Sequence, residues 1–208
     1  QTDQEYIVRF EEEAYALGLE GGYEYVADTL RVSYSSPTTP RQIFDFDMLT
    51  SQRTLLKQDE VPSGHNPADY ITRRIQAVAT DGELVPVTVL YSADMVIDGS
   101  NPILLYGYGS YGVSMPAGFQ TARLSLVDRG FVYAIAHIRG GMEKGYRWYT
   151  SGKRQQKWNT FTDFIAVAEA LIAENLARPG NITIHGGSAG GMLMGACINM
   201  RPELWRCV

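Results

Sequence analysis

The stretch that decides the fold is Ile182-Thr183-Ile184-His185-Gly186-Gly187-Ser188-Ala189-Gly190-Gly191, an apolar run followed at once by a serine between small residues. In the G-x-S-x-G motif a strand turns sharply into a helix, and the serine at the turn takes a strained backbone conformation that only small neighbours tolerate. Gly186 and Gly190 occupy the two glycine positions of that motif. The stretch therefore predicts a nucleophile elbow with Ser188 at its apex.

The helix predicted after the elbow supplies hydrogen-bond donors to the same site. Its first N–H groups have no partner within the helix and point to the space where a tetrahedral oxyanion would form, with Ala189 N–H as the first donor. A phosphate-binding loop uses the same geometry, and a glycine-rich turn without chemistry is the other alternative. A phosphate loop requires a G-K-[ST] ending, whereas Met192 follows Gly191 here. The serine-nucleophile interpretation is favoured.

Composition limits the class of protein. The 208 residues are 45% hydrophobic and 20% charged, which suits a globular chain with a substantial core. A net charge of −5 without a basic patch argues against nucleic acid as a partner. The sequence has neither a signal peptide nor an apolar span of about 20 residues, so we expect no membrane association. Cys197 and Cys207 are predicted to be buried thiols, which favours a cytoplasmic location and leaves the periplasm open.

Residues 1–58 have the pattern of an all-β segment. Short alternating runs are separated by turn residues, and they predict strands over 6–10, 23–26, 30–34, 43–47 and 53–56. The last two should form a hairpin that turns near residues 49–51. About four short strands correspond to one propeller blade, and one blade cannot close a propeller alone. We therefore expect a C-terminal blade of a β-propeller, and a chain that is a piece of a longer polypeptide.

The pattern changes after a linker predicted at residues 59–70. Strands are predicted over 75–79 and 85–91, with a turn at residues 81–82, and buried parallel strands over 103–106 and 131–138. A helix over 119–128 should end at Gly130. Thr160 to Asp163 has capping-box spacing and predicts the start of a second helix, whose apolar stripe is Phe161, Phe164, Ile165, Ala168, Leu171 and Ile172. Residues 71–208 thus predict a doubly wound α/β domain with its site at the carboxyl ends of the strands.

Two loops of this domain carry further candidate residues. After the strand at 103–106, Tyr108 lies where α/β hydrolases place a second oxyanion donor, and its hydroxyl could donate to a developing alkoxide; aromatic packing is the alternative. After the strand at 131–138, Arg139 and Glu143 are predicted to pair. A structural ion pair beside a glycine turn is favoured there over direct chemistry.

Five stretches together carry a family resemblance, and they are residues 106–112 (YGYGSYG), 124–141, 159–164 (NTFTDF), 186–195 (GGSAGGMLMG) and 201–204 (RPEL). In this order they resemble the prolyl oligopeptidase family of serine peptidases, and within it the oligopeptidase B group. The resemblance is dense from about residue 61 onward and weak before it. Ordered motifs of this kind are far more specific than a single G-x-S-x-G.

The resemblance implies an α/β-hydrolase peptidase domain, here only its part through the nucleophile helix, beneath a seven-bladed propeller that admits short peptides. It implies that Ser188 is the nucleophile and that Ala189 N–H and the Tyr108 hydroxyl form the oxyanion hole. It also implies that Tyr111 lines the primary specificity pocket. Cleavage after Arg or Lys is implied, with short peptides as partners and with no metal or organic cofactor.

The resemblance also places the catalytic Asp and His of the family beyond Val208, so we expect a missing C-terminal part to complete the triad and residues 1–208 alone to be inactive. His65, His137 and His185 are each predicted to be structural. Pro116 and Gly118 stand where relatives often have aspartates, and Met142 replaces a glycine. The first departure puts a dibasic preference in doubt.

Two alternatives remain open. The segment could belong to a non-catalytic binding module that keeps the hydrolase shape. It could also belong to an esterase or another exopeptidase of the family, because fold and elbow do not fix the substrate.

Overall fold

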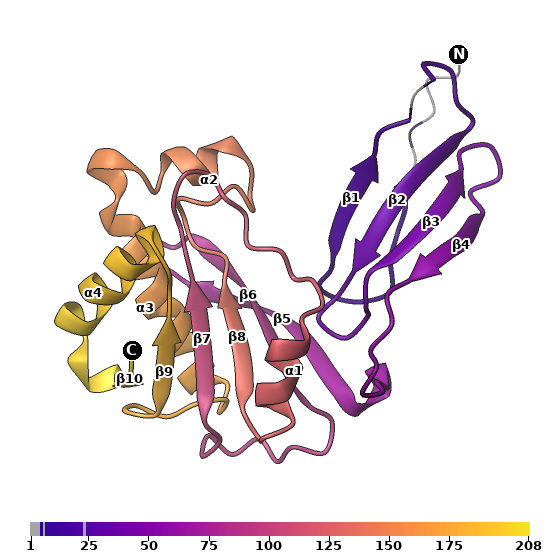
Figure 1. Ribbon diagram of the computed structural model, residues 1–208. Helices are drawn as coiled ribbons and strands as arrows, with labels where there is room; N and C mark the ends of the chain where they lie inside the picture. The colour runs from indigo at the N-terminus through magenta and orange to yellow at the C-terminus, as the bar shows by residue number, and fades with distance from the viewer. Residues whose placement is uncertain (1–4, 6, 23) are drawn as a thin grey trace.

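The structure is a computed structural model that describes residue 5, residues 7–22 and residues 24–208 of the chain. Its strands form two separate sheets, joined by a single connection after the fourth strand (Figure 1). The first sheet carries no helix between its strands, whereas helices alternate with strands in the second. The described chain is thus mixed α and β. None of its described helices is both long enough and apolar enough to cross a bilayer.

The first sheet is an antiparallel meander in which each strand pairs with the next along the chain. Its strands are β1 (Ala16–Glu20), β2 (Thr29–Ser35), β3 (Gln42–Asp47) and β4 (Arg53–Gln58). The hairpin predicted over residues 43–56 is confirmed, because β3 and β4 pair antiparallel. In the turn between them Ser51 N–H donates to Asp47 O at 2.8 Å, and Ser51 takes a φ of 59°.

Two of the predicted strands do not form. Tyr6 and Tyr23, which begin the runs 6–10 and 23–26, lie outside the described residues, and the rest of each run is without strand. The ring of Phe10 instead stacks on Tyr34 of β2, with centroids 4.8 Å apart. Its segment therefore crosses the apolar face of the sheet and does not extend its edge.

The strand that occupies the edge, β1, is one that the sequence does not predict. Its only large apolar side chains are Leu17 and Leu19, and Gly18 between them weakens a strand pattern. In the fold this glycine is required, since a Cβ there would lie 2.6 Å from Ser33 Oγ on β2. Close pairing with β2 thus determines β1.

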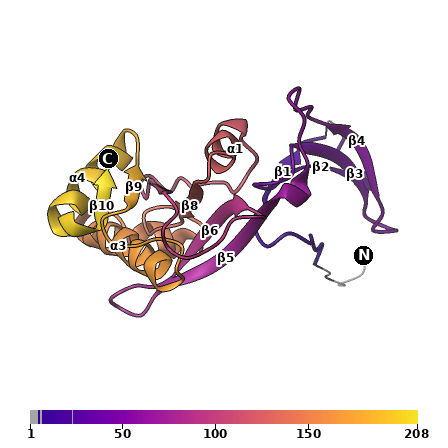
Figure 2. The ribbon, with the colours of Figure 1, turned by 90° about the horizontal axis from the view of Figure 1, so that it is seen from below.

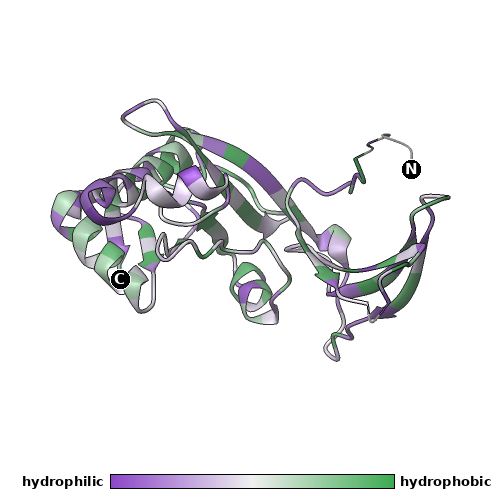
Figure 3. Ribbon diagram, turned by 90° about the horizontal axis from the view of Figure 1, so that it is seen from above, coloured by the Kyte–Doolittle hydropathy of each residue, from purple (hydrophilic) through white to green (hydrophobic). Residues whose placement is uncertain are grey.

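The second sheet has six strands in the order β10-β9-β7-β8-β6-β5. They are β5 (Tyr70–Val78), β6 (Leu84–Ser92), β7 (Ile103–Gly107), β8 (Val132–Ala136), β9 (Ile182–His185) and β10 (Trp205–Cys207). The parallel pairing predicted for β7 and β8 is confirmed, and β9 and β10 continue it. β5 and β6 form an antiparallel hairpin at the other edge. Bands of hydrophobic and hydrophilic residues alternate along β5, as expected of a strand with one covered face (Figure 3).

Helices cover both faces of this sheet (Figure 2). They are α1 (Thr121–Val127), α2 (Tyr146–Thr150), α3 (Trp158–Ala173) and α4 (Ala189–Met200), with short 3₁₀ helices η1 (Pro67–Asp69), η2 (Arg154–Gln156) and η3 (Pro202–Leu204). Leu124 and Val127 of α1 pack on one face, against Ile135 of β8. Phe164 and Leu171 of α3 join the larger cluster on the other face. The apolar stripe predicted for α3 is buried or half-buried throughout.

The start of α3 differs from the prediction. The helix begins at Trp158, two residues before the expected N-cap, and no side chain caps it. Thr160 Oγ1 donates to Arg139 O at 2.8 Å and to Gly152 O at 3.1 Å, so it serves a neighbouring loop. The carboxylate of Asp163 forms an ion pair with Arg139. The capping-box prediction is wrong because both side chains have tertiary partners.

The chain continues beyond the nucleophile helix. Within residues 71–208, η3 and β10 follow α4, and β10 pairs parallel with β9. Cys197 is buried in α4 as predicted, whereas Cys207 is exposed. Only one side of β10 has a partner strand among the described residues, which leaves Cys207 accessible.

Among the described residues, three polar contacts hold the four-stranded sheet to the rest of the chain. Phe119 N–H donates to Ser35 Oγ at 2.9 Å, and His65 Nε2 lies 2.5 Å from Thr38 O. Arg74 N–H donates to the carboxylate of Glu13 at 2.7 Å. The connection itself runs from the end of β4 to the start of β5 and includes η1. The domain limits at residues 58 and 70 stay a prediction.

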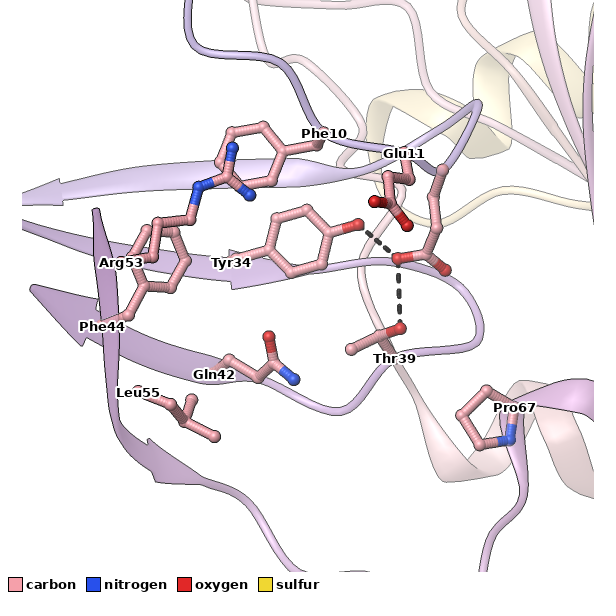
Figure 4. A pocket seen from close by; sticks show the side chains of 10 residues that line it. Phe10, Glu11, Tyr34, Thr39, Gln42, Phe44, Arg53, Leu55 and Pro67 are labelled. Atoms are coloured by element: carbon pink, nitrogen blue, oxygen red, sulfur yellow. Dashed lines mark hydrogen bonds between the residues drawn. The ribbon is translucent and has the colours of Figure 1, made fainter. Parts of the chain in front are cut away.

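A hollow of about 580 Å³ lies on the apolar face of the four-stranded sheet (Figure 4). Phe10, Tyr34 and Phe44 form its aromatic wall, and the Arg53 guanidinium lies 4.3 Å from the centroid of the Phe10 ring. This hollow belongs to the first sheet, whereas the elbow lies at the end of β9.

Candidate active site

The candidate site is built at the carboxyl ends of β7 and β9, which are neighbours in the sheet. Their parallel register sets Tyr106 opposite His185, so the loops after both strands leave from the same level. The loop after β9 is the elbow, and the loop after β7 carries Tyr108 and Tyr111. Segments about 80 residues apart in the sequence therefore meet at one edge.

Ser188 stands at the sharp turn that the sequence predicts. Its φ of 56° and ψ of −118° lie outside the regions that a serine ordinarily occupies, and its side chain is exposed. The residue directly precedes α4, which begins at Ala189. A strained, exposed serine between a strand and a helix is the geometry of an activated-nucleophile turn.

The glycines on either side of Ser188 permit close approach of backbone segments. A Cβ at Gly186 would lie 2.7 Å from Gly190 O, and a Cβ at Gly190 would lie 3.0 Å from Gly107 O. The first distance is shorter than Cβ contacts allow, and the second is at the limit. The start of α4 can therefore sit directly on the end of β7 only with small residues at these positions.

The first turn of α4 leaves one N–H group free beside the serine. Gly190 N–H donates to Gly187 O at 2.8 Å, and Gly191 N–H donates to Ser188 O at 2.9 Å. Within the described part of the chain Ala189 N–H has no acceptor. A free N–H next to an exposed serine hydroxyl can hold a negatively charged oxygen.

Tyr108 lies against the first turn of α4. Its Cδ2 atom is 3.5 Å, and its Cα atom 3.7 Å, from the place where a Cβ on Gly190 would be. The side chain is half-buried. The structure thus places Tyr108 against Gly190, which lies two residues after Ser188 in the elbow.

Tyr111 has a different setting on the same loop. Its φ is 57°, a left-handed value that costs a non-glycine residue about 1 kcal/mol or more. Its side chain is 76% exposed. The ring is therefore presented to the solvent side of the loop after β7, available to a bound molecule.

Arg139 and Glu143 do not pair with each other, so that prediction is wrong. Arg139 is bound by two other carboxylates, Asp163 of α3 and Asp81 of the β5–β6 turn. Its side chain is 4% exposed, and that of Asp163 is fully buried. Burial opposes the charge, but the hydrogen bonds that Arg139 donates to both carboxylates raise the pKa of Arg139 above its ordinary value. The same guanidinium lowers the pKa of Asp81.

Glu143 is buried beside His137 and the loop after β7. Its Oε1 accepts a hydrogen bond from Met115 N–H at 2.9 Å and lies 3.7 Å from His137 Nδ1. Glu143 thus helps hold the chain that follows Tyr111. Arg139 forms its ion pairs with Asp163 and Asp81 and not with Glu143.

Each of the three histidines is engaged away from Ser188. Burial, and after it the charge of Arg74, lowers the pKa of His137, whose Nε2 lies 2.9 Å from Arg74 Nη1. The ring of His65 packs between Tyr70 and Phe119. His185 contacts the ring of Tyr106, at 5.5 Å between centroids. Among the described residues, no histidine forms a hydrogen bond with Ser188.

Two residues near the site have no signal in the sequence. Asp163 is interpreted there as part of a capping box, and Lys157 is not singled out. Lys157 Nζ donates to Gly109 O at 2.6 Å and to Ser110 Oγ at 2.9 Å, in the loop that carries Tyr108. Both contacts span more than 45 positions along the chain. Local sequence patterns do not reveal contacts of that separation.

Comparison with known proteins agrees with this geometry. A model of the prolyl oligopeptidase family matches residues 117–208. The dipeptidyl aminopeptidase BI of Pseudoxanthomonas mexicana is 47% identical over 202 residues, which are 97% of this chain and 28% of that protein. Protease 2 of Moraxella lacunata is 35% identical over 201 residues, covering 97% of this chain and 29% of that protein.

Solved structures give the same result. Oligopeptidase B from Trypanosoma brucei, in a closed form with covalently bound antipain, superposes with a TM-score of 0.88 at 42% identity. The match covers 96% of this chain and 28% of that one. The chain therefore spans less than a third of the length of these relatives. The elbow lies within the stretch that the family model matches, and the chain is similar to proteins of the prolyl oligopeptidase family over nearly its whole length.

Proposed function

We propose that the whole protein is a serine-type oligopeptidase that hydrolyses short peptides, with Ser188 as its nucleophile. The observation that carries this proposal is the backbone of Ser188, strained at φ 56° and ψ −118°, with an exposed side chain at the start of α4. Strain of this kind persists only where surrounding contacts impose it, and it gathers at functional residues. The match of residues 117–208 to a peptidase family supports the same assignment.

The proposed architecture is an α/β-hydrolase domain that begins in residues 71–208, joined through residues 59–70 to a propeller blade in residues 1–58. The parallel pairing of β7, β8, β9 and β10, with helices on both faces, supports the hydrolase domain. The four-stranded meander supports the blade. The end of β4 at Gln58 and the start of β5 at Tyr70 support the limits.

The proposed mechanism is acyl transfer. A histidine outside residues 1–208, oriented by an aspartate also outside them, takes the proton of Ser188 as Oγ attacks the scissile carbonyl. The carbonyl oxygen becomes an oxyanion that accepts hydrogen bonds from Ala189 N–H and the Tyr108 hydroxyl. The histidine then returns the proton to the leaving amine, and water releases the acyl group by the same steps. Each oxyanion donor contributes roughly 3 kcal/mol to lowering the barrier.

The proposed specificity is cleavage after Arg or Lys, with Tyr111 in contact with the substrate. The resemblance to oligopeptidase B supports it, and the exposed ring of Tyr111, on the loop that carries Tyr108, is compatible with such a contact. A second activity, removal of dipeptides from the amino end, is favoured by the 47% identity to a dipeptidyl aminopeptidase. The two activities differ in whether a free amino terminus is required.

The test uses the full-length protein with reporter peptides that end in Arg, Lys or Pro, each with a free or a blocked amino terminus, and with an ester reporter. We expect turnover of blocked Arg and Lys reporters, and loss of at least about 10³-fold in kcat with Ser188→Ala. Turnover confined to dipeptides with a free amino terminus would support the second activity. A preference for Pro would overturn the basic specificity, and a preference for the ester would favour an esterase. Activity that survives Ser188→Ala would overturn the nucleophile.

A fluorophosphonate, which reacts with activated serines, distinguishes an enzyme from a binding module. We expect one adduct per chain by intact mass, absent in Ser188→Ala. A full-length protein that folds cooperatively but forms no adduct and turns over none of the reporters would be a binding module with a hydrolase shape.

A further inference from the structure

The loop after β7 has a backbone conformation that needs support from other segments. Gly109, Tyr111 and Gly112 all take positive φ values, of 63°, 57° and 69°. The loop lies outside regular secondary structure, and Tyr111 is a non-glycine residue in a left-handed conformation. A conformation of this kind persists only where contacts from the rest of the fold impose it. The position of Tyr108 therefore depends on what fastens residues 109–112.

Two kinds of contact fasten the loop. The first is backbone hydrogen bonding, in which Gly112 N–H donates to Gly140 O at 2.9 Å and Val113 N–H donates to Ser110 O at 3.0 Å. Among the described residues, both side-chain hydrogen bonds to residues 108–112 come from Lys157, whose Nζ donates to Gly109 O at 2.6 Å and to Ser110 Oγ at 2.9 Å. The backbone contacts hold the far part of the loop. Lys157 holds the part adjacent to Tyr108.

Lys157 is an unfavourable residue for the helix that carries it. It stands at the N-cap of α3, where the helix dipole disfavours a positive charge, and it makes no capping hydrogen bond. No carboxylate of the described chain lies within ion-pair distance of its Nζ. Burial lowers the pKa of its ammonium group, which shows that the site costs the charge some of its hydration. Its hydrogen bonds to the loop are what offsets these costs.

The carbonyl that Lys157 holds sets the orientation of the neighbouring peptide plane. Gly109 O belongs to the peptide bond between Gly109 and Ser110, so holding it restricts the ψ torsion of Gly109, the residue that follows Tyr108. The base of the loop is rigid beneath it, because a Cβ at Gly109 would lie 2.5 Å from Thr160 Cγ2 on α3. One helical turn of α3 thus supports the loop through packing at Thr160 and through a charged hydrogen bond at Lys157.

We propose that Lys157 is a positioning residue that holds the Tyr108 hydroxyl where it can donate to the oxyanion formed at Ser188. This inference rests on the proposed function. Without the ammonium group the peptide between Gly109 and Ser110 is free to turn, the loop next to Tyr108 is no longer held, and the hydroxyl moves away from the developing charge. The substrate contacts made in the ground state stay as they are.

The test uses the full-length protein and the variants Lys157→Met, Lys157→Arg and Tyr108→Phe. Lys157→Met is expected to lower kcat about tenfold with KM changed less than twofold, because a donor misplaced by about 1 Å loses a large part of its effect on the transition state alone. Lys157→Arg, which retains a charged donor, is expected to restore kcat to within about threefold. Lys153→Met is the matched control, since Lys153 contacts the ring of Tyr149 and not the loop, and its kcat should be unchanged.

The double variant decides whether Lys157 acts through Tyr108. In the Tyr108→Phe background, Lys157→Met should change kcat less than twofold, because the hydroxyl that it positions is absent. Affinity for a peptide aldehyde, which forms a tetrahedral adduct with a serine, should fall with Lys157→Met by the same factor as kcat/KM. An equal loss of kcat in both backgrounds, or a rise in KM at constant kcat, would overturn the proposal.

Failure of this inference can be told apart from failure of the proposed function. If Tyr108→Phe leaves kcat unchanged while Ser188→Ala abolishes turnover, the peptidase assignment stands and the positioning role of Lys157 is wrong. A thermal unfolding curve accompanies each variant. If Lys157→Met unfolds at a lower temperature, the Lys157→Arg comparison and the double variant are measured below that transition, and they decide the outcome.

Discussion

Arg139 and Asp163 are joined by three hydrogen bonds, from Arg139 N–H at 3.0 Å, Nε at 2.8 Å and Nη2 at 2.5 Å to the carboxylate of Asp163. The pair ties the loop after β8 to the middle of α3, and it lies beneath the loop that carries Tyr108. Arg139 also binds Asp81 from the solvent side. One buried cation is thus shared by a buried and a half-exposed carboxylate.

Replacing the buried carboxylate is expected to cost far more than replacing the exposed one. Asp163→Asn leaves Arg139 buried with a neutral partner, and should lower the free energy of unfolding by about 3 kcal/mol. Asp81→Asn should cost less than about 1 kcal/mol, because the side chain of Asp81 is 45% exposed and its charge is screened by water. Urea unfolding of both variants measures the difference. Equal losses would contradict the assignment of Asp163 as the principal partner.

Gly190→Ala is expected to damage activity more than stability. Its Cβ would meet Gly107 O at 3.0 Å and Tyr108 Cδ2 at 3.5 Å, so the start of α4 must move relative to the end of β7. The movement needed is a few tenths of an ångström, and because a misplacement of about 1 Å can cost about 10²-fold, it should lower kcat by roughly threefold to tenfold. The matched control is Gly195→Ala in the same helix, where a Cβ meets nothing within 4 Å. That variant should gain about 0.5–1 kcal/mol in unfolding free energy with kcat unchanged, and a comparable loss of kcat in it would refute the steric argument.

The carboxylate of Glu12 should give the four-stranded sheet an acid-sensitive contribution to stability. It accepts hydrogen bonds from the hydroxyl groups of Tyr34, Ser36, Thr38 and Thr39. Burial favours the neutral acid, but these hydrogen bonds outweigh it and lower the pKa of Glu12 below its ordinary 4.5. A lowered folded-state pKa means that the contribution is complete above pH 4.5 and is lost as the pH falls through the folded-state value.

The measurement compares urea unfolding of the full chain and of Glu12→Gln between pH 7 and pH 3. At pH 7 the variant should be less stable by about 1 kcal/mol, since a charged acceptor is replaced by a weaker, half-exposed one. The difference should shrink below pH 4.5. A difference that grows on acidification would show the opposite sign of the pKa shift.

Residues 1–208 expressed alone are expected to turn over no Arg-linked amide reporter. The reason is chemical, because no histidine of the described chain contacts Ser188, and a serine hydroxyl without a base is a weak nucleophile. Circular dichroism would establish first that the isolated chain is folded. Turnover by a folded sample that Ser188→Ala abolishes would show that a base lies within these residues.

The sequence predicts well those elements whose conformation is determined by residues close together in the chain. The elbow follows from glycines within two positions of Ser188, and the β3–β4 hairpin follows from a turn of a few residues at Ser51. Parallel strands β7 and β8 follow from apolar runs that need cover on both faces. In each case the determining interaction lies within one strand or one turn.

What it misses is decided by tertiary contact. Asp163 has the spacing of a capping box, yet a buried guanidinium 24 positions away binds it more strongly than a helix end would. β1 forms because Gly18 admits Ser33 of the next strand, and the predicted strand at residues 6–10 is replaced by stacking of Phe10 on Tyr34. Both side-chain hydrogen bonds of Lys157 reach residues 47 and 48 positions away. To predict each of these features, one must know which distant segment of the chain packs beside the residue.

The three contacts that hold the four-stranded sheet to the rest of the chain all come from one end of that sheet, at Glu13, Ser35 and Thr38. The opposite end, with the turn between β3 and β4, points away from the six-stranded sheet (Figure 1). The orientation of the four-stranded sheet relative to the six-stranded sheet is therefore set at one end of the smaller sheet, by the side chains of Glu13 and Ser35 and by the backbone of Thr38.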